Sequence, residues 1–178
     1  MFASLRRARG RRLAAHAAYG RIVERARAPE FYLAAGVPDT VDGRFELLAL
    51  HAFLVLNRLK REHAASAAFA QELFDTMFGD LDRTLREMGA GDLGVGPRIK
   101  AMARGFYGRI AAYEQGLADE VELEAALRRN LYGTVPAIGE SAVASMAGYV
   151  RRQAAALAAL SLAALLEGDV AFADLELS

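Results

Sequence analysis

The chain contains no cysteine and only four prolines among its 178 residues. Without cysteine it can form no disulfide, no thiolate metal site and no cysteine nucleophile. Few prolines, together with abundant alanine and leucine, favour helices. Because 54% of the residues are hydrophobic and low-complexity repeats are absent, the composition is that of a folded protein. We therefore expect an all-α, single-domain protein.

Long hydrophobic runs are also lacking. The longest one, AAALAALSLAALL at residues 154–166, has 13 residues, and charged residues bound it on both sides. A transmembrane helix needs about 20 apolar residues, so this run predicts a buried helix. The N-terminal residues have no apolar core and no cleavage site of the kind found in secretory signals. The sequence thus predicts neither a membrane span nor a secretory signal.

Charge of one sign is not in excess overall, but it is unevenly distributed. Residues 1–63 hold 12 Lys/Arg against 6 Asp/Glu, and the remainder holds 10 against 16. We define residues 1–12 as a basic N-terminal arm. Two interpretations of the arm stay open, namely contact with anionic lipid or RNA phosphate, and a frayed solvated terminus. Its cations are Arg6, Arg7, Arg9, Arg11 and Arg12.

Apolar residues recur with helical spacing from residue 13 to residue 168, and no segment shows strand alternation. This pattern predicts a helical bundle of about six principal helices over 13–168, followed by a loosely held acidic tail, 169–178. Thr40 or Asp39, and Asp119 with Glu122, are the expected N-caps of two of the helices. The expected helices cover 13–28, 42–62, 66–88, 97–117, 119–132 and 141–166.

The second expected helix is unusually apolar. Only His51 interrupts the run LLALHAFLVL at residues 47–56. A helix that is apolar all round must be covered on every side, so we predict that it lies at the centre of the bundle. Partial exposure toward an apolar partner is the alternative. His51 is expected to be a hydrogen-bonded core histidine.

Residues 89–94 read GAGDLG, which matches the G-x-G-x-x-G pattern of dinucleotide-binding proteins. That pattern needs a preceding strand. Here a helical pattern precedes it, so we interpret the glycines as a helix C-cap and a sharp reversal. The predicted structural loop comprises Gly89, Gly91, Gly94 and Pro97, with Pro97 opening the next helix.

Patterns typical of catalysis or metal binding are missing. His16, His51 and His63 match no metal-ligand spacing, and no Glu-x-x-His pair or nucleophile-elbow pattern occurs. We therefore expect no catalytic residues, no metal and no cofactor. The residues indicate a binding protein, not an enzyme.

Two segments resemble the ubiquinol–cytochrome c chaperone family. They are residues 31–60, with GVPDT-x-DGRFE and LH-x-FLVL-x-RL, and residues 74–113, with FD-x-MF-x-DLDR-x-LREMG-x-GDLGVG and FYGR. The resemblance implies an assembly chaperone that binds newly made cytochrome b and assists its incorporation into the cytochrome bc1 complex, ubiquinol–cytochrome c reductase. It also implies contact with the ribosome and none with DNA. We expect a bacterial member, peripheral at the inner face of the cytoplasmic membrane.

An apolar client needs an apolar, adaptable surface, which methionine and phenylalanine supply. Candidate client-binding residues between the second, third and fourth expected helices are Phe53, Phe74, Met77, Phe78, Met102 and Phe106; the alternative is that all six are core. Candidate lipid or RNA contacts are the arginines of the basic arm together with Arg98, Lys100 and Arg104. The competing function is a non-catalytic adaptor whose basic surface binds membrane or ribosomal RNA.

Overall fold

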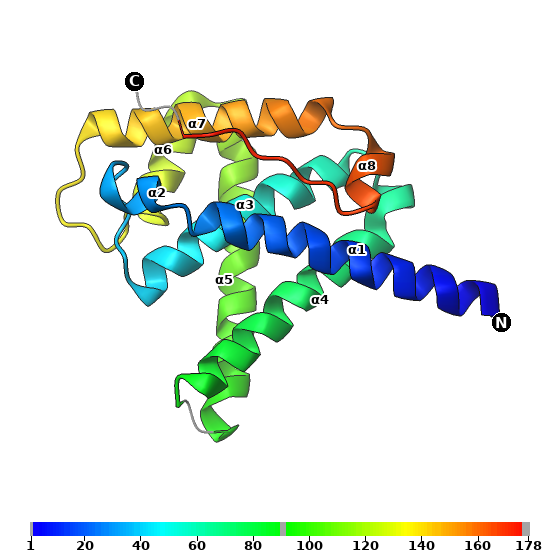
Figure 1. Cartoon of the computed structure of the whole chain (residues 1–178). Helices are drawn as coiled ribbons and strands as arrows, with labels where there is room; N and C mark the ends of the chain where they lie inside the picture. Colours follow the sequence, from blue (N-terminus) through cyan, green and yellow to red (C-terminus); the bar gives the residue numbers. More distant parts are fainter. Residues whose placement is uncertain (1, 90–91, 176–178) are drawn as a thin grey trace.

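The computed structural model describes residues 2–89 and 92–175, and these form helices joined by short connections (Figure 1). Six are long, as the sequence predicts, and two are single turns. No strand occurs among the described residues, so the prediction of an all-α protein is confirmed. The helices are α1 (Phe2–Ala26), α2 (Pro29–Leu33), α3 (Val41–Lys60), α4 (His63–Glu87), α5 (Asp92–Ala118), α6 (Glu120–Arg129), α7 (Glu140–Ala159) and α8 (Leu162–Leu166).

Side-chain caps begin three of these helices. The Thr40 hydroxyl accepts a hydrogen bond from the Gly43 backbone N–H at the start of α3, and Asp119 accepts two at the start of α6. Both positions were predicted. The expected helix 141–166 is instead two helices, because Leu160 has extended backbone (ψ 141°) and Ser161 caps α8.

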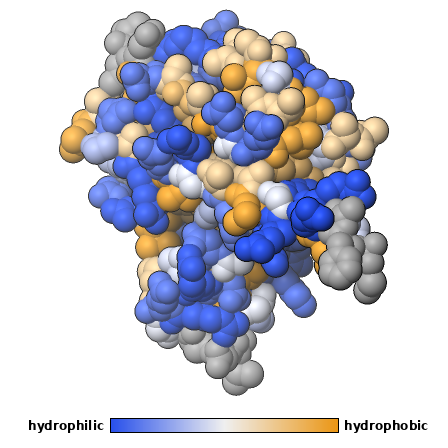
Figure 2. Space-filling view, turned by 45° about the vertical axis from the view of Figure 1, so that its right-hand side comes forward, coloured by the Kyte–Doolittle hydropathy of each residue, from blue (hydrophilic) through white to orange (hydrophobic). Residues whose placement is uncertain are grey.

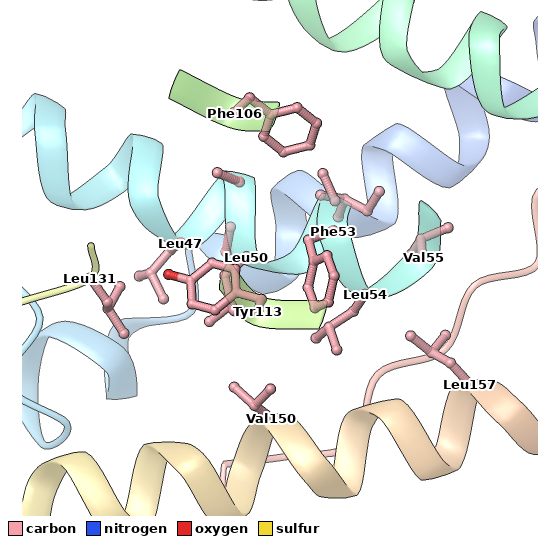
Figure 3. Packing of buried hydrophobic residues seen from close by; sticks show 14 of the residues in the cluster. Leu47, Leu50, Phe53, Leu54, Val55, Phe106, Tyr113, Leu131, Val150 and Leu157 are labelled. Carbon is pink, nitrogen blue, oxygen red and sulfur yellow. The ribbon is translucent and has the colours of Figure 1, made fainter. Parts of the chain in front are cut away.

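The helix α3 lies at the centre of the bundle. Leu47, Leu50 and Phe53 are completely buried. Val150 and Leu157 of α7 pack on one side of α3, and Phe106 of α5 packs on another (Figure 3). The prediction of a central, fully covered helix is therefore confirmed.

His51 is hydrogen-bonded within this core. Its Nδ1 donates to the carbonyl of Leu47 (2.7 Å), so its Nε2 accepts from the Tyr149 hydroxyl (2.8 Å). Tyr149 in turn accepts from the Nε of Arg25 (3.0 Å), which links α3, α7 and α1. Burial lowers the pKa of His51 to about 4, so the ring is neutral at pH 7. The expectation of a satisfied core histidine is confirmed.

The described residues near both ends of the chain are more ordered than expected. Helix α1 begins at Phe2, not near residue 13, so the basic arm is the first part of a continuous helix. The tail runs back alongside α7 (Figure 1). There Val170 is buried, and the Gln153 amide both donates to and accepts from the backbone of Ala173. The expectation of a loosely held tail is wrong for residues 169–173.

The α4–α5 hairpin extends away from the other helices, downward in Figure 1. Gly89 has φ +86° and ends α4, as predicted. The predicted loop is otherwise too long, because α5 already begins at Asp92 and includes Gly94 and Pro97. Pro97 therefore removes one helical hydrogen bond from α5 instead of opening the helix. The predicted loop residue Gly91 lies outside the described residues.

Candidate binding groove

An apolar pocket of about 280 Å³ lies where α1, α3, α4 and α5 converge. The N-terminal turns of α3 form one wall, and the C-terminal halves of α1 and α4 form two others. The amphipathic pattern of each helix places an apolar stripe here. The apolar lining residues are Val23, Ala26, Val41, Phe45, Leu48, Leu81, Leu85, Met88 and Met102.

Some of this apolar lining is open to solvent. Met88 is 59% exposed at the end of α4, and Val41 is 50% exposed at the start of α3. The thioethers of Met88 and Met102 can adapt their shape to different apolar surfaces. An apolar pocket with exposed methionine at its mouth suits an apolar side chain or helix face better than a small polar ligand.

Polar groups surround the apolar lining. The Tyr19 hydroxyl donates to Asp80 (2.8 Å), and burial raises the pKa of this tyrosine above its ordinary value. Arg44 pairs with Asp39 (2.6 Å) on the surface beside the pocket. Arg27 is exposed at the rim and has no ion-pair partner among the described residues. The rim therefore offers a cation to an incoming segment.

A second, more polar pocket of about 480 Å³ continues from the first. The two share Val41, Phe45, Leu85 and Met102, so we define them together as the groove. In the polar part, the Nε of Arg109 donates to Glu46 (2.6 Å), and this ion pair ties α5 to α3. Arg98 and Arg129 line it as exposed cations. The groove thus has an apolar end and a basic end.

The six candidate client-binding residues differ in burial and in position. Phe53, Met77 and Phe106 are fully buried core residues, and Phe78 is nearly so. Phe74 is half-buried on α4, where its ring stacks on Tyr107 at 5.7 Å between ring centroids. Met102 alone among the six lines the groove. Client contact by these residues stays a prediction.

The candidate lipid or RNA contacts form two separate groups. Five arginines lie on the first turns of α1, and Arg98, Lys100 and Arg104 are exposed on the N-terminal half of α5. The start of α1 and the end of the hairpin are at different extremities of the molecule (Figure 1). The two groups therefore do not form one continuous basic patch.

Several groove residues were missed by sequence reasoning. Val41 directly follows the Thr40 cap, and Met88 directly precedes Gly89. A large apolar residue at an exposed helix end was the available signal, since such ends are usually polar. Phe45 and Leu81 could not be recognised as groove residues, because the apolar stripe of a helix has the same sequence pattern whether it faces the groove or the core.

No group of three or more His, Asp or Glu side chains is close enough to hold a metal ion within 2–89 and 92–175. Over the same described residues, no helix is both long and apolar enough to cross a bilayer.

The fold is a helical domain, and its open groove is lined in part by Met88 and Met102. Residues 33–172 match the family model described as ubiquinol-cytochrome C chaperone. The chain therefore belongs to the ubiquinol–cytochrome c chaperone family, as its sequence motifs predicted. The match includes the α3, α4 and α5 walls of the groove but not α1.

Individual relatives agree with this assignment. The chain is 31% identical over 121 residues to ubiquinol-cytochrome-c reductase complex assembly factor 1 of Xenopus laevis, and 30% identical over 122 residues to the Homo sapiens protein. These matches cover 67% and 68% of this chain but 60% and 41% of the relatives. A crystal structure of the Cbp3 homolog from Brucella abortus superposes with a TM-score of 0.85, at 40% identity and 98% coverage of both chains.

Proposed function

We propose that this protein is an assembly chaperone that binds newly made cytochrome b and assists its incorporation into the cytochrome bc1 complex. Membership of the family supports assembly of that complex as the process. In this proposal the protein is not an enzyme and works at the inner face of the cytoplasmic membrane, next to its client. Ribosome contact while the client is being made is part of the same proposal.

The groove is the observation that carries the proposal. A membrane-protein client has apolar helices that aggregate in water until they are inserted or assembled. The apolar end of the groove can cover one face of such a helix, with Met88 and Met102 adapting to its side chains. The basic end, with Arg98 and Arg129, can pair with acidic residues that flank the helix.

Site-specific crosslinking tests the groove directly. The chain has no cysteine, so Met88→Cys gives a single attachment point for a photo-crosslinker at the groove mouth. We expect light-dependent capture of cytochrome b when the purified, labelled protein is added to an extract that is translating cytochrome b. Val121→Cys on α6 is the matched control, because Val121 is also an exposed apolar residue but lies outside the groove. Equal capture from both positions, or none from Met88→Cys, contradicts the groove as the client site.

A deletion strain tests the function itself. We expect it to lose assembled bc1 complex and the b-haem absorbance of its membranes, while the cytochrome b message is unchanged. Normal bc1 levels would contradict the chaperone proposal.

The basic surfaces on α1 and α5 favour the second candidate, a non-catalytic adaptor that binds membrane or ribosomal RNA without a client. Ribosome co-sedimentation over a salt series distinguishes the two. The adaptor requires strong, salt-sensitive binding in a strain where bc1 assembly is normal.

A further inference from the structure

The first turns of α1 expose leucines among arginines. Leu5 and Leu13 are 60% and 62% exposed. With about 100° between successive helix residues, these two leucines lie on the same side of α1, and Arg6 and Arg9 lie within or beside the same arc. The bundle-facing side of α1 is provided farther along, by buried residues such as Ile22. Leu5 and Leu13 are therefore not covered by the bundle.

The charge of this segment is entirely positive. Residues 1–23 contain six arginines and no Asp or Glu. Arg12 pairs with Glu72 of α4 at 3.3 Å, and Arg11 is half-buried. Arg6, Arg7 and Arg9 are exposed and have no ion-pair partner among the described residues. Three exposed cations on one short helical segment create a local positive potential that attracts an anionic surface.

We propose that residues 5–13 of α1 dock the protein on an anionic lipid bilayer. The leucines enter the boundary between headgroups and acyl chains, and the arginines extend to lipid phosphates. RNA would satisfy the arginines equally well, but it would leave Leu5 and Leu13 in water. The exposed leucines therefore favour a bilayer over RNA as the occupant.

This docking mode leaves the groove accessible. The N-terminal end of α1 projects beyond the bundle, to the right in Figure 1. Val23, near the other end of α1, lines the groove. At about 1.5 Å per residue, Arg9 and Val23 are on the order of 20 Å apart along the helix. The groove would thus sit close to the bilayer without being buried in it.

Fluorescence of a single tryptophan tests the docking. The chain has no tryptophan, so Leu5→Trp gives one reporter in the proposed surface. We expect its emission to shift to shorter wavelength with vesicles of 30% phosphatidylglycerol in phosphatidylcholine, but not with phosphatidylcholine alone. The shift should disappear at high salt, which screens the arginines. Leu33→Trp on α2, at a position 85% exposed, is the matched control and should not shift. Equal shifts at both positions, or none at Leu5→Trp, would overturn the proposal.

Vesicle co-sedimentation of unlabelled variants separates lipid from RNA. Replacing Leu5 and Leu13 by serine should weaken binding to anionic vesicles at least tenfold. Replacing Arg6, Arg7 and Arg9 by glutamine should weaken it about a hundredfold. The same change at Arg98, Lys100 and Arg104 of α5 is the matched control, expected to alter binding less than threefold.

Two results contradict the bilayer as occupant. The first is unchanged vesicle binding by the double serine variant. The second is binding of wild-type protein to single-stranded poly(U) RNA with no binding to vesicles. Because both leucines are exposed, the serine variant should unfold at the wild-type temperature, which circular dichroism checks.

Discussion

Helix α3 and the α4–α5 hairpin differ in how many neighbours cover them. Helices α1, α4, α5 and α7 all pack against α3, and its buried residues point in every direction around the helix axis. The hairpin end, from residue 83 to residue 100, has only Leu85 and Val95 buried among its described side chains. On the face shown in Figure 2, the lower part, where the hairpin ends, is mainly hydrophilic.

Because of this difference, we expect α3 to determine the stability of the fold and the hairpin to be available for binding. A residue on α3 contacts core atoms on all sides, so a change there alters the free energy of unfolding. A residue toward the end of the hairpin contacts its partner helix and solvent. Changes there are tolerated by the fold, and the hairpin can supply the wall of an open groove. We expect substitutions in the two regions to affect different measurements.

The largest expected effect compares two phenylalanines. Phe53→Ala in α3 removes a fully buried ring that packs 5.5 Å from the ring of Tyr113, centroid to centroid. It should lower the free energy of unfolding by about 3–5 kcal/mol. Phe74→Ala in the hairpin removes a half-buried ring that contacts Phe78, Phe106 and the exposed Tyr107, and should cost about 2 kcal/mol. Urea denaturation measures both. Similar losses would show that the hairpin is as tightly packed as α3.

A smaller effect depends on pH and compares two histidines. Burial lowers the pKa of His51 to about 4, against about 6.5 in the unfolded chain. Between these two pKa values the unfolded state binds more protons than the folded state. The stability contributed by neutral His51 is therefore complete above pH 6.5 and is lost as the pH falls toward 4. The loss is up to about 3 kcal/mol.

Because paired carboxylates also titrate, the informative quantity is the difference between wild type and His51→Gln. The variant should be less stable at pH 7, and this deficit should shrink as the pH falls to 4. His63→Gln, at an exposed position at the start of α4, should follow the wild-type curve. A constant deficit for His51→Gln would mean that His51 does not resist protonation.

Most of the fold could be predicted from the sequence because helical periodicity is a local signal. The run around His51 predicted the central helix, and Thr40 and Asp119 predicted two caps. The break at Leu160 was not predicted, because the single cap residue Ser161 lies in a run of helix-forming residues. Arg58, which donates to the carbonyls of Leu157 and Leu160, adds a tertiary contact at the break that the local sequence does not reveal. The basic arm was not expected to be helical because its arginines show no apolar periodicity.

The groove was less predictable. Sequence reasoning favoured methionine and phenylalanine as residue types, but five of the six chosen residues do not line the groove. A stripe on an amphipathic helix does not reveal whether another helix covers it. Met102 and the buried Phe106 lie on the same helix, and only the crossing of α5 over α3 and α4 distinguishes them.

The smallest expected effects come from two glycines, one in each region. A Cβ at Gly43, in the first turn of α3, would lie 2.0 Å from the carbonyl oxygen of Pro38, so Gly43→Ala forces the backbone apart and should cost about 1–3 kcal/mol. A Cβ at Gly94 in α5 meets no atom within 4 Å, and its φ is not positive. Gly94→Ala should therefore raise the free energy of unfolding by about 0.5–1 kcal/mol, as expected for alanine in a helix. Thermal unfolding, monitored by circular dichroism, shows whether each variant is less or more stable than the wild type. If Gly94→Ala were destabilised, Gly94 would lie in a turn that requires glycine. That result would contradict a helix that begins at Asp92.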